Sequence, residues 1–276
     1  MRKLSSLTSL HIPILSLAFA ALFVPNAFAA CQSPAAFGGW LQSFKKEAIA
    51  QGISPNVVSE ALDGLTYDPS VIAKDRGQGV FAQSFLQFSG RMVSGNRLSV
   101  GSALLKKNAA AFARIRQQYG VPGPVLVGFW GLETDFGKVM GNMDTLRSLA
   151  TLAFDCRRPD EFREQLLDAL RVIQRGDLTP SGMRGPWAGE VGQFQFVPSV
   201  YFKYAVDFDG DGRRDLERSV PDMLASTANF LKGHGWRAGQ GWEPGSANYA
   251  VIRDWNRAEV YQRTIAVMAS KLREGP

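Results

Sequence analysis

One glutamate in this sequence stands in an apolar segment where a carboxyl group is costly to bury. Glu133 follows the run 125–132, which contains no polar side chain, and Phe136 comes three positions later. On a helix, residues three or four positions apart share a face, so Phe129, Trp130 and Phe136 are expected beside this carboxyl group. Burial without a partner raises the pKa of a carboxyl group and keeps it protonated near neutral pH. We predict that Glu133 is a general acid; a structural glutamate paired with an arginine is the alternative.

The helix that carries Glu133 is expected to begin at 122–124, where two prolines flank a glycine. It should run to Phe136, with Gly137 ending it. Asp135 is the nearest second carboxylate, but it lies two positions from Glu133 and therefore points to another face of the helix. We expect Asp135 to be solvated or to cap the helix, and a catalytic role for it is the alternative. The segment offers no other obvious carboxylate that could act as a nucleophile.

A second group of acidic residues has the spacing of an EF-hand calcium loop. Carboxylates stand at loop positions 1, 3, 5 and 9, a glycine at position 6 permits a sharp turn, and position 7 offers a main-chain carbonyl. These residues are Asp207, Asp209, Asp211, Asp215, Gly212 and Arg213. Position 12 is Arg218 instead of the usual acid, so we expect Asp222 to supply the last ligand. The pattern predicts a structural Ca²⁺ site with a weak affinity of about 10⁻⁴ to 10⁻³ M; a turn without metal is the alternative.

Amide and aromatic side chains in the second half of the chain suit the binding of sugars through hydrogen bonds and ring stacking. The amides are Gln193, Gln195 and Asn256. The aromatic residues that accompany them are Trp187, Phe194, Phe196, Tyr201, Trp255 and Tyr261. Each aromatic residue taken alone is more often part of a core, so this prediction depends on the whole group.

The histidine content and the charge exclude several classes of protein. His11 falls in a predicted signal peptide, so His234 is the only histidine of the mature chain. Serine and cysteine hydrolases usually need a histidine base, and a three-histidine zinc site cannot form. The net charge is +6, or +4 without Arg2 and Lys3, which suits an anionic polymer. No clustered basic and aromatic residues indicate a nucleic-acid partner, and no organic cofactor is expected.

Residues 1–29 are predicted to be a secretory signal peptide. Two basic residues precede the apolar run 12–24, and residues 27–29 form a small-x-small cleavage pattern. Cys31 and Cys156 are the only cysteines, and both would reach a compartment that permits oxidation. We expect a disulfide between them; acylation of Cys31 at a lipoprotein processing site is the alternative.

Helix signals dominate the rest of the chain. Ser54-Pro55 opens a predicted helix 54–62, and an apolar stripe over 105–119 indicates helical packing that stops at Gly120. Helices are also expected over 222–232 and 258–272, whereas the glycine- and proline-rich segment 176–198 is expected to be irregular and to wrap a site. Alternating strand patterns are scarce. The predicted fold class is mainly α, with a small hairpin and the calcium loop.

Several segments together resemble the lytic murein transglycosylases of the B type. They are 131–137, 188–199, the acidic loop, 229–236 and 255–257. The resemblance implies a lysozyme-like α+β fold over 30–276, with a helical part 30–120, a catalytic core 121–276 and no wall-binding module at the C-terminal end. It maps the family's catalytic glutamate onto Glu133, its cleft residues onto Gln195, Asn256 and Tyr261, and its calcium ligands onto Asp207, Asp209, Asp211, Arg213 and Asp222.

The activity that this resemblance implies is cleavage of peptidoglycan between N-acetylmuramic acid and N-acetylglucosamine, with a 1,6-anhydro product. A hydrolytic muramidase and a non-catalytic wall-binding protein are the alternatives. The signal peptide predicts a periplasmic location. We expect a monomer that binds glycan strands, with other cell-wall enzymes as further partners. The sequence departs from the family at Pro186, where a serine is common, at Glu190, where a small apolar residue is usual, and at Phe230, where a tyrosine is familiar.

Overall fold

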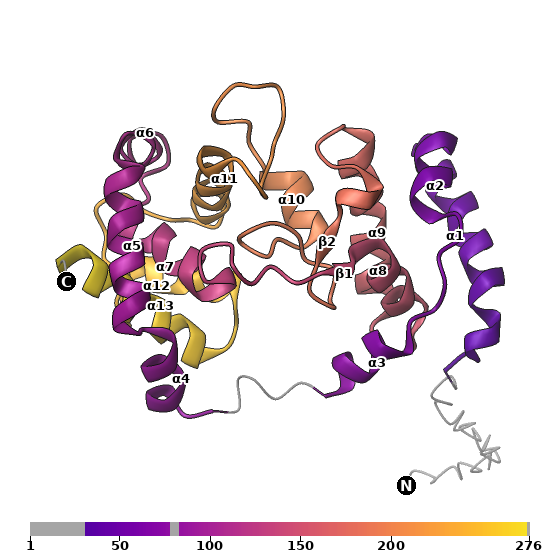
Figure 1. The fold of residues 1–276 in the computed structure, drawn as a ribbon, viewed down its shortest axis with the longest axis horizontal. Helices are drawn as coiled ribbons and strands as arrows, with labels where there is room; N and C mark the ends of the chain where they lie inside the picture. Colours follow the sequence, from indigo (N-terminus) through magenta and orange to yellow (C-terminus); the bar gives the residue numbers. More distant parts are fainter. Residues whose placement is uncertain (1–30, 78–82, 275–276) are drawn as a thin grey trace, which may run out of the picture. The chain divides into compact units, whose positions relative to one another are not determined.

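The computed structural model of the protein describes residues 31–77 and 83–274, so the predicted signal peptide lies outside the described residues. Within these ranges the chain is mainly helical, as predicted (Figure 1). The α-helices are α1 (Phe37–Ala50), α2 (Pro55–Leu62), α3 (Pro69–Arg76), α4 (Phe85–Met92), α5 (Gly95–Lys107), α6 (Ala109–Tyr119), α7 (Gly123–Thr134), α8 (Thr145–Phe154), α9 (Pro159–Gln174), α10 (Pro198–Tyr204), α11 (Val220–Gly233), α12 (Ala247–Trp255) and α13 (Glu259–Glu274). Two short 3₁₀ helices are η1 (Pro34–Ala36) and η3 (Pro180–Gly182).

Local capping explains where several of these helices begin and end. The Ser54 side chain accepts a hydrogen bond from the main-chain N–H of Val57, so α2 begins at the predicted Ser-Pro pair. The stripe predicted over 105–119 is divided between α5 and α6 at Asn108, whose side-chain nitrogen donates to the Leu104 carbonyl in the last turn of α5. Gly120 then ends α6 with a left-handed φ of 77°.

A very small sheet accompanies the helices. Strands β1 (Met143–Asp144) and β2 (Arg184–Gly185) pair antiparallel, two residues each. The prediction of a hairpin is wrong for this pair, because α8 and α9 lie between the two strands in the sequence. A tight hairpin-like turn does occur nearby, where Val191 and Phe196 exchange two main-chain hydrogen bonds. It lies in the segment 176–198, which contains no α-helix before α10, as predicted.

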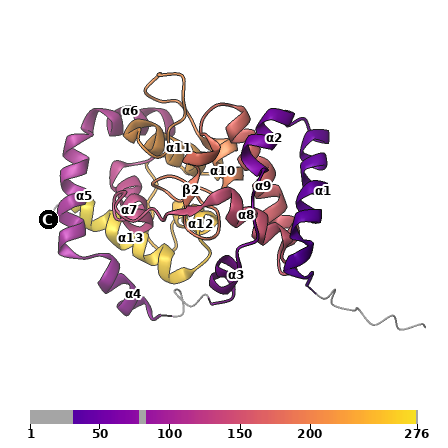
Figure 2. The ribbon, with the colours of Figure 1, turned by 45° about the vertical axis from the view of Figure 1, so that its right-hand side comes forward.

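Helix α7 is the buried helix around which the functional half of the chain is packed. All its residues from Val125 to Leu132 are buried, as expected for a helix that is apolar on every side. It packs against α5 and α6 from the predicted helical part 30–120 and against α11 and α13 from the predicted catalytic core 121–276. The two predicted parts are therefore in direct contact. Gly131 lets α13 approach closely, since a Cβ there would come within 2.6 Å of the Met268 side chain. Figures 1 and 2 both show α7, α12 and α13 lying together.

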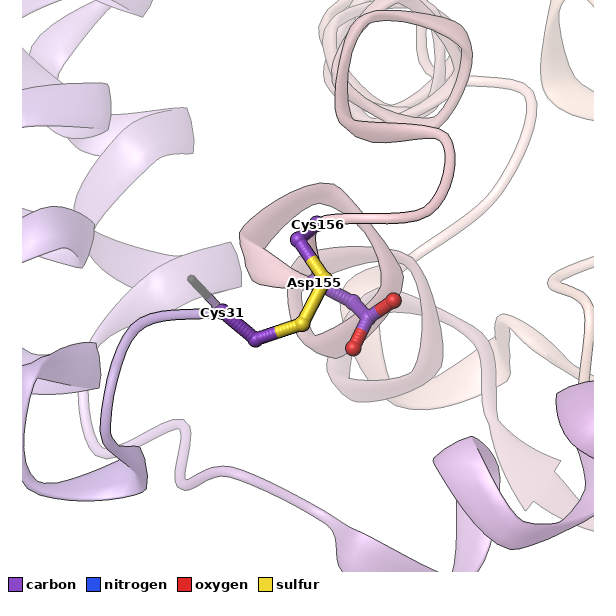
Figure 3. A group of neighbouring side chains, drawn as sticks. All are labelled: Cys31, Asp155 and Cys156. Atoms are coloured by element: carbon purple, nitrogen blue, oxygen red, sulfur yellow. A yellow bond between two sulfur atoms is a disulfide. The ribbon is translucent and has the colours of Figure 1, made fainter. Parts of the chain in front are cut away.

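Helices α8, α9 and α10 form a second packed group, against which α1, α2 and α3 lie. The predicted disulfide between Cys31 and Cys156 is confirmed, with a Cα–Cα separation of 5.0 Å (Figure 3). It attaches the start of the described chain to the turn between α8 and α9. Asp155 beside it pairs with Arg76 at 2.8 Å. Among the described residues, no helix is both long and apolar enough to cross a bilayer.

Candidate active site

Glu133 lies in the last turn of α7, and the way this helix ends differs from the prediction. The helix stops at Thr134, and Asp135 and Phe136 both adopt left-handed conformations with φ of 49° and 62°. The main-chain N–H of Phe136 donates to the carbonyl of Trp130, and that of Asp135 donates to Gly131, so these two N–H groups satisfy carbonyls near the end of the helix. Phe136 is therefore not on the helical face of Glu133, and the predicted wall of three aromatic residues from one helix is wrong.

The aromatic surroundings of Glu133 come instead from α12 and α13. The indole N–H of Trp255 donates a hydrogen bond of 2.8 Å to Oε1 of Glu133, and the Tyr261 hydroxyl donates to the same oxygen. Phe129, one turn before Glu133 on α7, lies 4.9 Å from the Trp255 ring between centroids. Two residues more than 120 positions away along the chain thus enclose the carboxyl group, which no local sequence pattern reveals.

The environment of Glu133 raises its pKa to about 7, from an ordinary value of 4.5. Removal from water is the main cause, the hydrogen bonds from Tyr261 and Trp255 act in the opposite direction, and the charge of Glu190 adds a small increase. Both donors contact Oε1, so a proton on the carboxyl group is carried by Oε2. The predicted property of Glu133, a carboxylic acid that keeps its proton near neutral pH, agrees with this geometry.

Tyr261 is suited to remain a donor. Its side chain is buried, and burial together with the neighbouring Glu133 raises its pKa well above the ordinary value of 10. Its hydroxyl group therefore keeps its proton and stabilises the ionised form of Glu133 whenever that form appears. The indole N–H of Trp255 likewise donates to Glu133 and stabilises its ionised form. The sequence predicted Trp255 only as one of the aromatic residues that accompany the amides, and did not predict its direct contact with the acid.

Asp135 is tied into ion pairs on the surface side of the helix end. Its carboxylate contacts Arg97 at 2.9 Å and Lys138 at 3.6 Å. The hydrogen bond from Arg97 is the main reason that the pKa of Asp135 lies below its usual value. Asp135 is therefore an ionised, structurally engaged residue that ends α7, in line with the expectation that it caps the helix.

Gln195 stands in the tight turn between Val191 and Phe196. It has a left-handed φ of 53°, uncommon for a residue other than glycine and typical of strained functional positions. Its amide nitrogen donates to the carbonyls of Gly192 at 3.0 Å and Met140 at 3.4 Å. Gln195 also lines a hollow of about 210 Å³ together with Trp255, the residue that contacts Glu133. Gln195 and Trp255 thus share one hollow, and a contact of Gln195 with substrate remains a prediction.

Gln193 holds protein segments together, although the sequence suggested it as a sugar ligand. Its Oε1 accepts from the indole of Trp130 at 2.8 Å, and its Nε2 donates to the Glu217 carbonyl at 2.6 Å. Its own carbonyl accepts from the Thr134 hydroxyl at 2.7 Å, next to Glu133. A Cβ at Gly137 would come within 2.5 Å of the Gln193 amide, so this contact also requires a glycine there. A contact with substrate remains a prediction for Gln193.

The other predicted sugar-binding residues occupy different places. Asn256 follows Trp255 and uses its side-chain oxygen to accept from the Ala258 N–H at 2.9 Å, at the turn into α13. Trp187 is partly exposed and lines a separate pocket. Phe230, one of the positions that depart from the family, is buried with its ring 5.1 Å from that of Trp255. A phenylalanine there supplies the same aromatic wall without a hydroxyl group.

Three carboxylates of the loop that follows α10 gather around a fourth from the first turn of α11, and the loop extends away from the neighbouring helices in Figures 1 and 2. Oxygens of Asp207, Asp209, Asp211 and Asp222 all lie within 4.8 Å of one another. Asp222 is fully buried, and its two oxygens accept main-chain N–H groups from within the same loop. This hard-oxygen set fits Ca²⁺, which takes six to eight oxygens at about 2.3–2.6 Å. Asp215 is not part of the cluster, because one of its oxygens accepts two N–H groups of the next turn.

The fold and this arrangement define the class of protein. The family model of the transglycosylase SLT domain matches residues 36–245, and the chain belongs to that family.

Particular relatives sharpen this assignment. The membrane-bound lytic murein transglycosylase B of Escherichia coli K12 is 36% identical over 157 residues, which are 56% of this chain and 43% of that protein. The matched region therefore spans less than half of that relative.

Two solved structures are also similar. SltB3 of Pseudomonas aeruginosa, in complex with NAG-anhNAM-pentapeptide, has a TM-score of 0.82 and 31% identity, over 87% of this chain and 80% of that one. The Escherichia coli lytic transglycosylase Slt35 in complex with calcium has a TM-score of 0.75 and 25% identity, over 85% of this chain and 92% of that one. The lysozyme-like helical fold predicted from the resemblance is thereby confirmed.

Proposed function

We propose that the protein is a lytic transglycosylase that cleaves the β-1,4 bond between N-acetylmuramic acid and N-acetylglucosamine in peptidoglycan. The observation that carries this proposal is the environment of Glu133, an enclosed carboxyl group with a pKa of about 7 and both of its donors on one oxygen. Membership of the family supports it, as does the anhydro-sugar ligand named for SltB3. Glu133 is the catalytic acid, and Gln195, Asn256, Trp187 and Tyr261 are proposed to line the cleft.

The first chemical step is protonation of the leaving group. Glu133 donates the proton on Oε2 to the glycosidic oxygen while the bond from that oxygen to C1 of the muramic sugar breaks. The sugar passes through an oxocarbenium-like state, and Glu133 becomes a carboxylate. Trp255 and Tyr261 then make charge-assisted hydrogen bonds to Oε1, which are stronger than those made to the neutral acid. Their contribution therefore increases as the reaction proceeds.

The second step uses the same carboxylate as a base. Glu133 takes the proton of the muramic C6 hydroxyl as its oxygen bonds to C1, so the acid is restored and no water is consumed. Asp135 is held by Arg97 and Lys138, so the segment that carries the acid offers no free second carboxylate as a nucleophile. The acetamido group of the muramic sugar is proposed to stabilise C1 instead, as in other substrate-assisted glycosidases.

Calcium is proposed as a structural ion held by Asp207, Asp209, Asp211, Asp222 and the main-chain carbonyl of Arg213. When bound, it neutralises clustered carboxylates and takes no part in the proton transfers. Its loop reaches the active site through Gln193, whose main-chain N–H donates to Leu216 and whose side chain donates to Glu217. A bound ion would thus steady the segment on which Trp130 and Thr134 rest.

Secretion to the periplasm through residues 1–29 is also proposed, with peptidoglycan strands as the partner and a monomeric state. The engagement of Cys31 in a disulfide supports a secreted form over acylation at that cysteine. Action alongside other cell-wall enzymes remains part of this proposal.

The deciding experiment is mass spectrometry of soluble products from purified peptidoglycan. Mature protein is expected to release anhydromuropeptides, each one water lighter than its hydrolytic counterpart, and Glu133→Gln none. Reducing-end products would show a hydrolytic muramidase instead. Binding to the wall without any product would show a non-catalytic binding protein.

A further inference from the structure

A pocket of about 250 Å³ adjoins the cleft and contains polar groups that the proposed reaction does not use. Trp187, Glu190 and Arg158 line it, together with Phe162, Gln165 and Val197. Val197 also lines the hollow that contains Gln195 and Trp255, so the two cavities are neighbours. The charge of Glu190 also raises the pKa of Glu133 slightly, so the two carboxyl groups lie within electrostatic range of each other.

Two atoms of this pocket lack partners. In the described parts of the chain, five buried side-chain polar atoms have no hydrogen bond, and two of them are Oε2 of Glu190 and Nε of Arg158. The other nitrogens of Arg158 are engaged, with Asp75 at 2.6 Å and with Glu161 at 3.4 Å. Buried polar groups without partners are costly, and their concentration at one cavity indicates a ligand.

The main chain holds Glu190 firmly in place. A Cβ on Gly185 would come within 1.8 Å of the Glu190 carbonyl oxygen, so β2 and this residue touch backbone to backbone. On the other side, Gly189 has a φ of 88°, and a Cβ there would come within 2.3 Å of Leu149. A side chain mounted on such a fixed backbone can hold a carboxyl group at a defined position.

The two unpartnered atoms have complementary needs. Glu190 offers an acceptor in either protonation state, and rotation of its carboxyl group can present either oxygen to the pocket. Arg158 offers an N–H donor. A secondary amide supplies both partners, because its N–H donates and its carbonyl accepts. The partly exposed ring of Trp187 adds a flat apolar surface for the rest of such a ligand.

We propose that this pocket binds a secondary amide of the wall polymer, with Glu190 as the acceptor, Arg158 as the donor and Trp187 as the packing surface. The inference rests on the proposed function for its choice of polymer. Two amides of peptidoglycan have this chemistry, the acetamido group of a sugar and the peptide stem. The test below separates these two sources.

The test measures binding by calorimetry in the Glu133→Gln background, so no turnover disturbs it. The probes are NAG-NAM-pentapeptide and the same disaccharide without its peptide. Glu190→Ala is expected to weaken binding about tenfold, the effect of losing one buried partner, whereas Glu190→Gln keeps an acceptor and should stay within about threefold. The exposed Glu164, which does not line the pocket, provides the control Glu164→Gln, for which no change is expected.

Weakening confined to the pentapeptide ligand identifies the stem, and equal weakening of both ligands identifies the acetamido group. Unchanged affinity for both ligands overturns the proposal. The carboxyl group of Glu190 also accepts main-chain N–H groups of Ala188 and Glu190, so thermal melts of Glu190→Ala check that the variant is folded before its binding is measured.

If the alanine variant does not fold, Arg158→Lys tests the same site. It removes the Nε donor and keeps the charge, and similar weakening is expected, with unchanged affinity again overturning the proposal. Binding is measured without catalysis, so a failure here is distinct from an absence of anhydro products, which would contradict the proposed function alone.

Discussion

Glu133 and Asp222 are carboxylic acids largely shielded from water, but their partners differ. Glu133 is enclosed by aromatic rings and accepts two side-chain hydrogen bonds on a single oxygen. Asp222 accepts main-chain N–H groups on both oxygens and has three other carboxylates close by. Burial raises the pKa of both groups, and at Asp222 the charge of Asp209 raises it further.

The surroundings of each carboxyl group determine whether it transfers a proton or binds a metal ion. A lone carboxyl group in a nearly dry, aromatic setting avoids the cost of ionisation by holding a proton, which makes it an acid. The clustered carboxylates accept main-chain N–H groups of their loop and still have lone pairs left to bind a metal ion. A divalent cation would also reduce the repulsion between their negative charges. Residues of one chemical kind thus serve proton transfer in one place and metal binding in the other.

The largest expected effect comes from removing the acid. Glu133→Gln should lower kcat for anhydromuropeptide release by about 10³-fold, within the range typical of a lost general acid. The melting temperature should not fall, because the amide avoids the ionisation cost of a buried carboxylate. Steady-state assays and thermal melts of both proteins give this comparison. A variant that keeps more than a tenth of the wild-type kcat would rule out Glu133 as the acid.

The acidic loop should instead affect stability. At a Ca²⁺ concentration about 100-fold above Kd, binding stabilises the folded state by about 2.7 kcal/mol. For a chain of this size, that corresponds to a rise in Tm of about 5–10 °C relative to protein in chelator. Asp209→Asn is the matched variant and should show a much smaller rise. Identical melting curves with calcium and with chelator would argue against the site.

The contrast between these regions also explains what could be predicted from sequence. Acidic ligands that alternate with glycine within a dozen residues form a local pattern, so the cluster of Asp207, Asp209 and Asp211 could be anticipated. The raised pKa of Glu133 could also be anticipated, because the apolar run 125–132 predicts burial. In both cases the information lies within one or two turns of the chain.

The parts that sequence analysis missed depend on distant contacts or on uncommon backbone conformations. Trp255 and Tyr261 reach Glu133 from α12 and α13, and only tertiary packing brings them there. The end of α7 was placed too late because Gly137 is the usual residue for a left-handed turn, whereas Asp135 and Phe136 adopt that conformation first. Their cost is offset by the ion pairs of Asp135 and by the packing of Phe136 on Trp130, 5.7 Å between ring centroids.

The pH dependence should separate the acid from its donors. Activity that requires protonated Glu133 should fall as the pH rises through about 7. The hydrogen bond from Tyr261 lowers the pKa of Glu133, so Tyr261→Phe should move this alkaline limb to higher pH. It should also lower kcat about tenfold, because the carboxylate formed in the first step loses a charge-assisted bond. Profiles of kcat against pH for both proteins test this, and a limb displaced to lower pH would contradict the assignment.

The same group links stability to pH. Folded Glu133 holds its proton up to about pH 7, whereas the unfolded chain releases it near 4.5. The folded state therefore binds more protons in this window, and the contribution of Glu133 to the free energy of unfolding declines as the pH rises through it. Glu133→Gln should lack this component, which chemical denaturation at pH 5 and pH 7.5 would reveal.

Asp135 should give the smallest effect and is the sharpest test of a single-carboxylate mechanism. Arg97 holds its pKa below the usual value, so it is ionised across the working range and cannot supply a proton. Asparagine tolerates the left-handed backbone at this position, and the lost ion pair is partly exposed, so Asp135→Asn should cost at most about 1 kcal/mol of stability. We expect kcat to change less than about threefold. A loss of about 100-fold in a folded variant would make Asp135 a second catalytic carboxylate, favour the two-carboxylate chemistry of hydrolases, and remove the need for the acetamido group at C1.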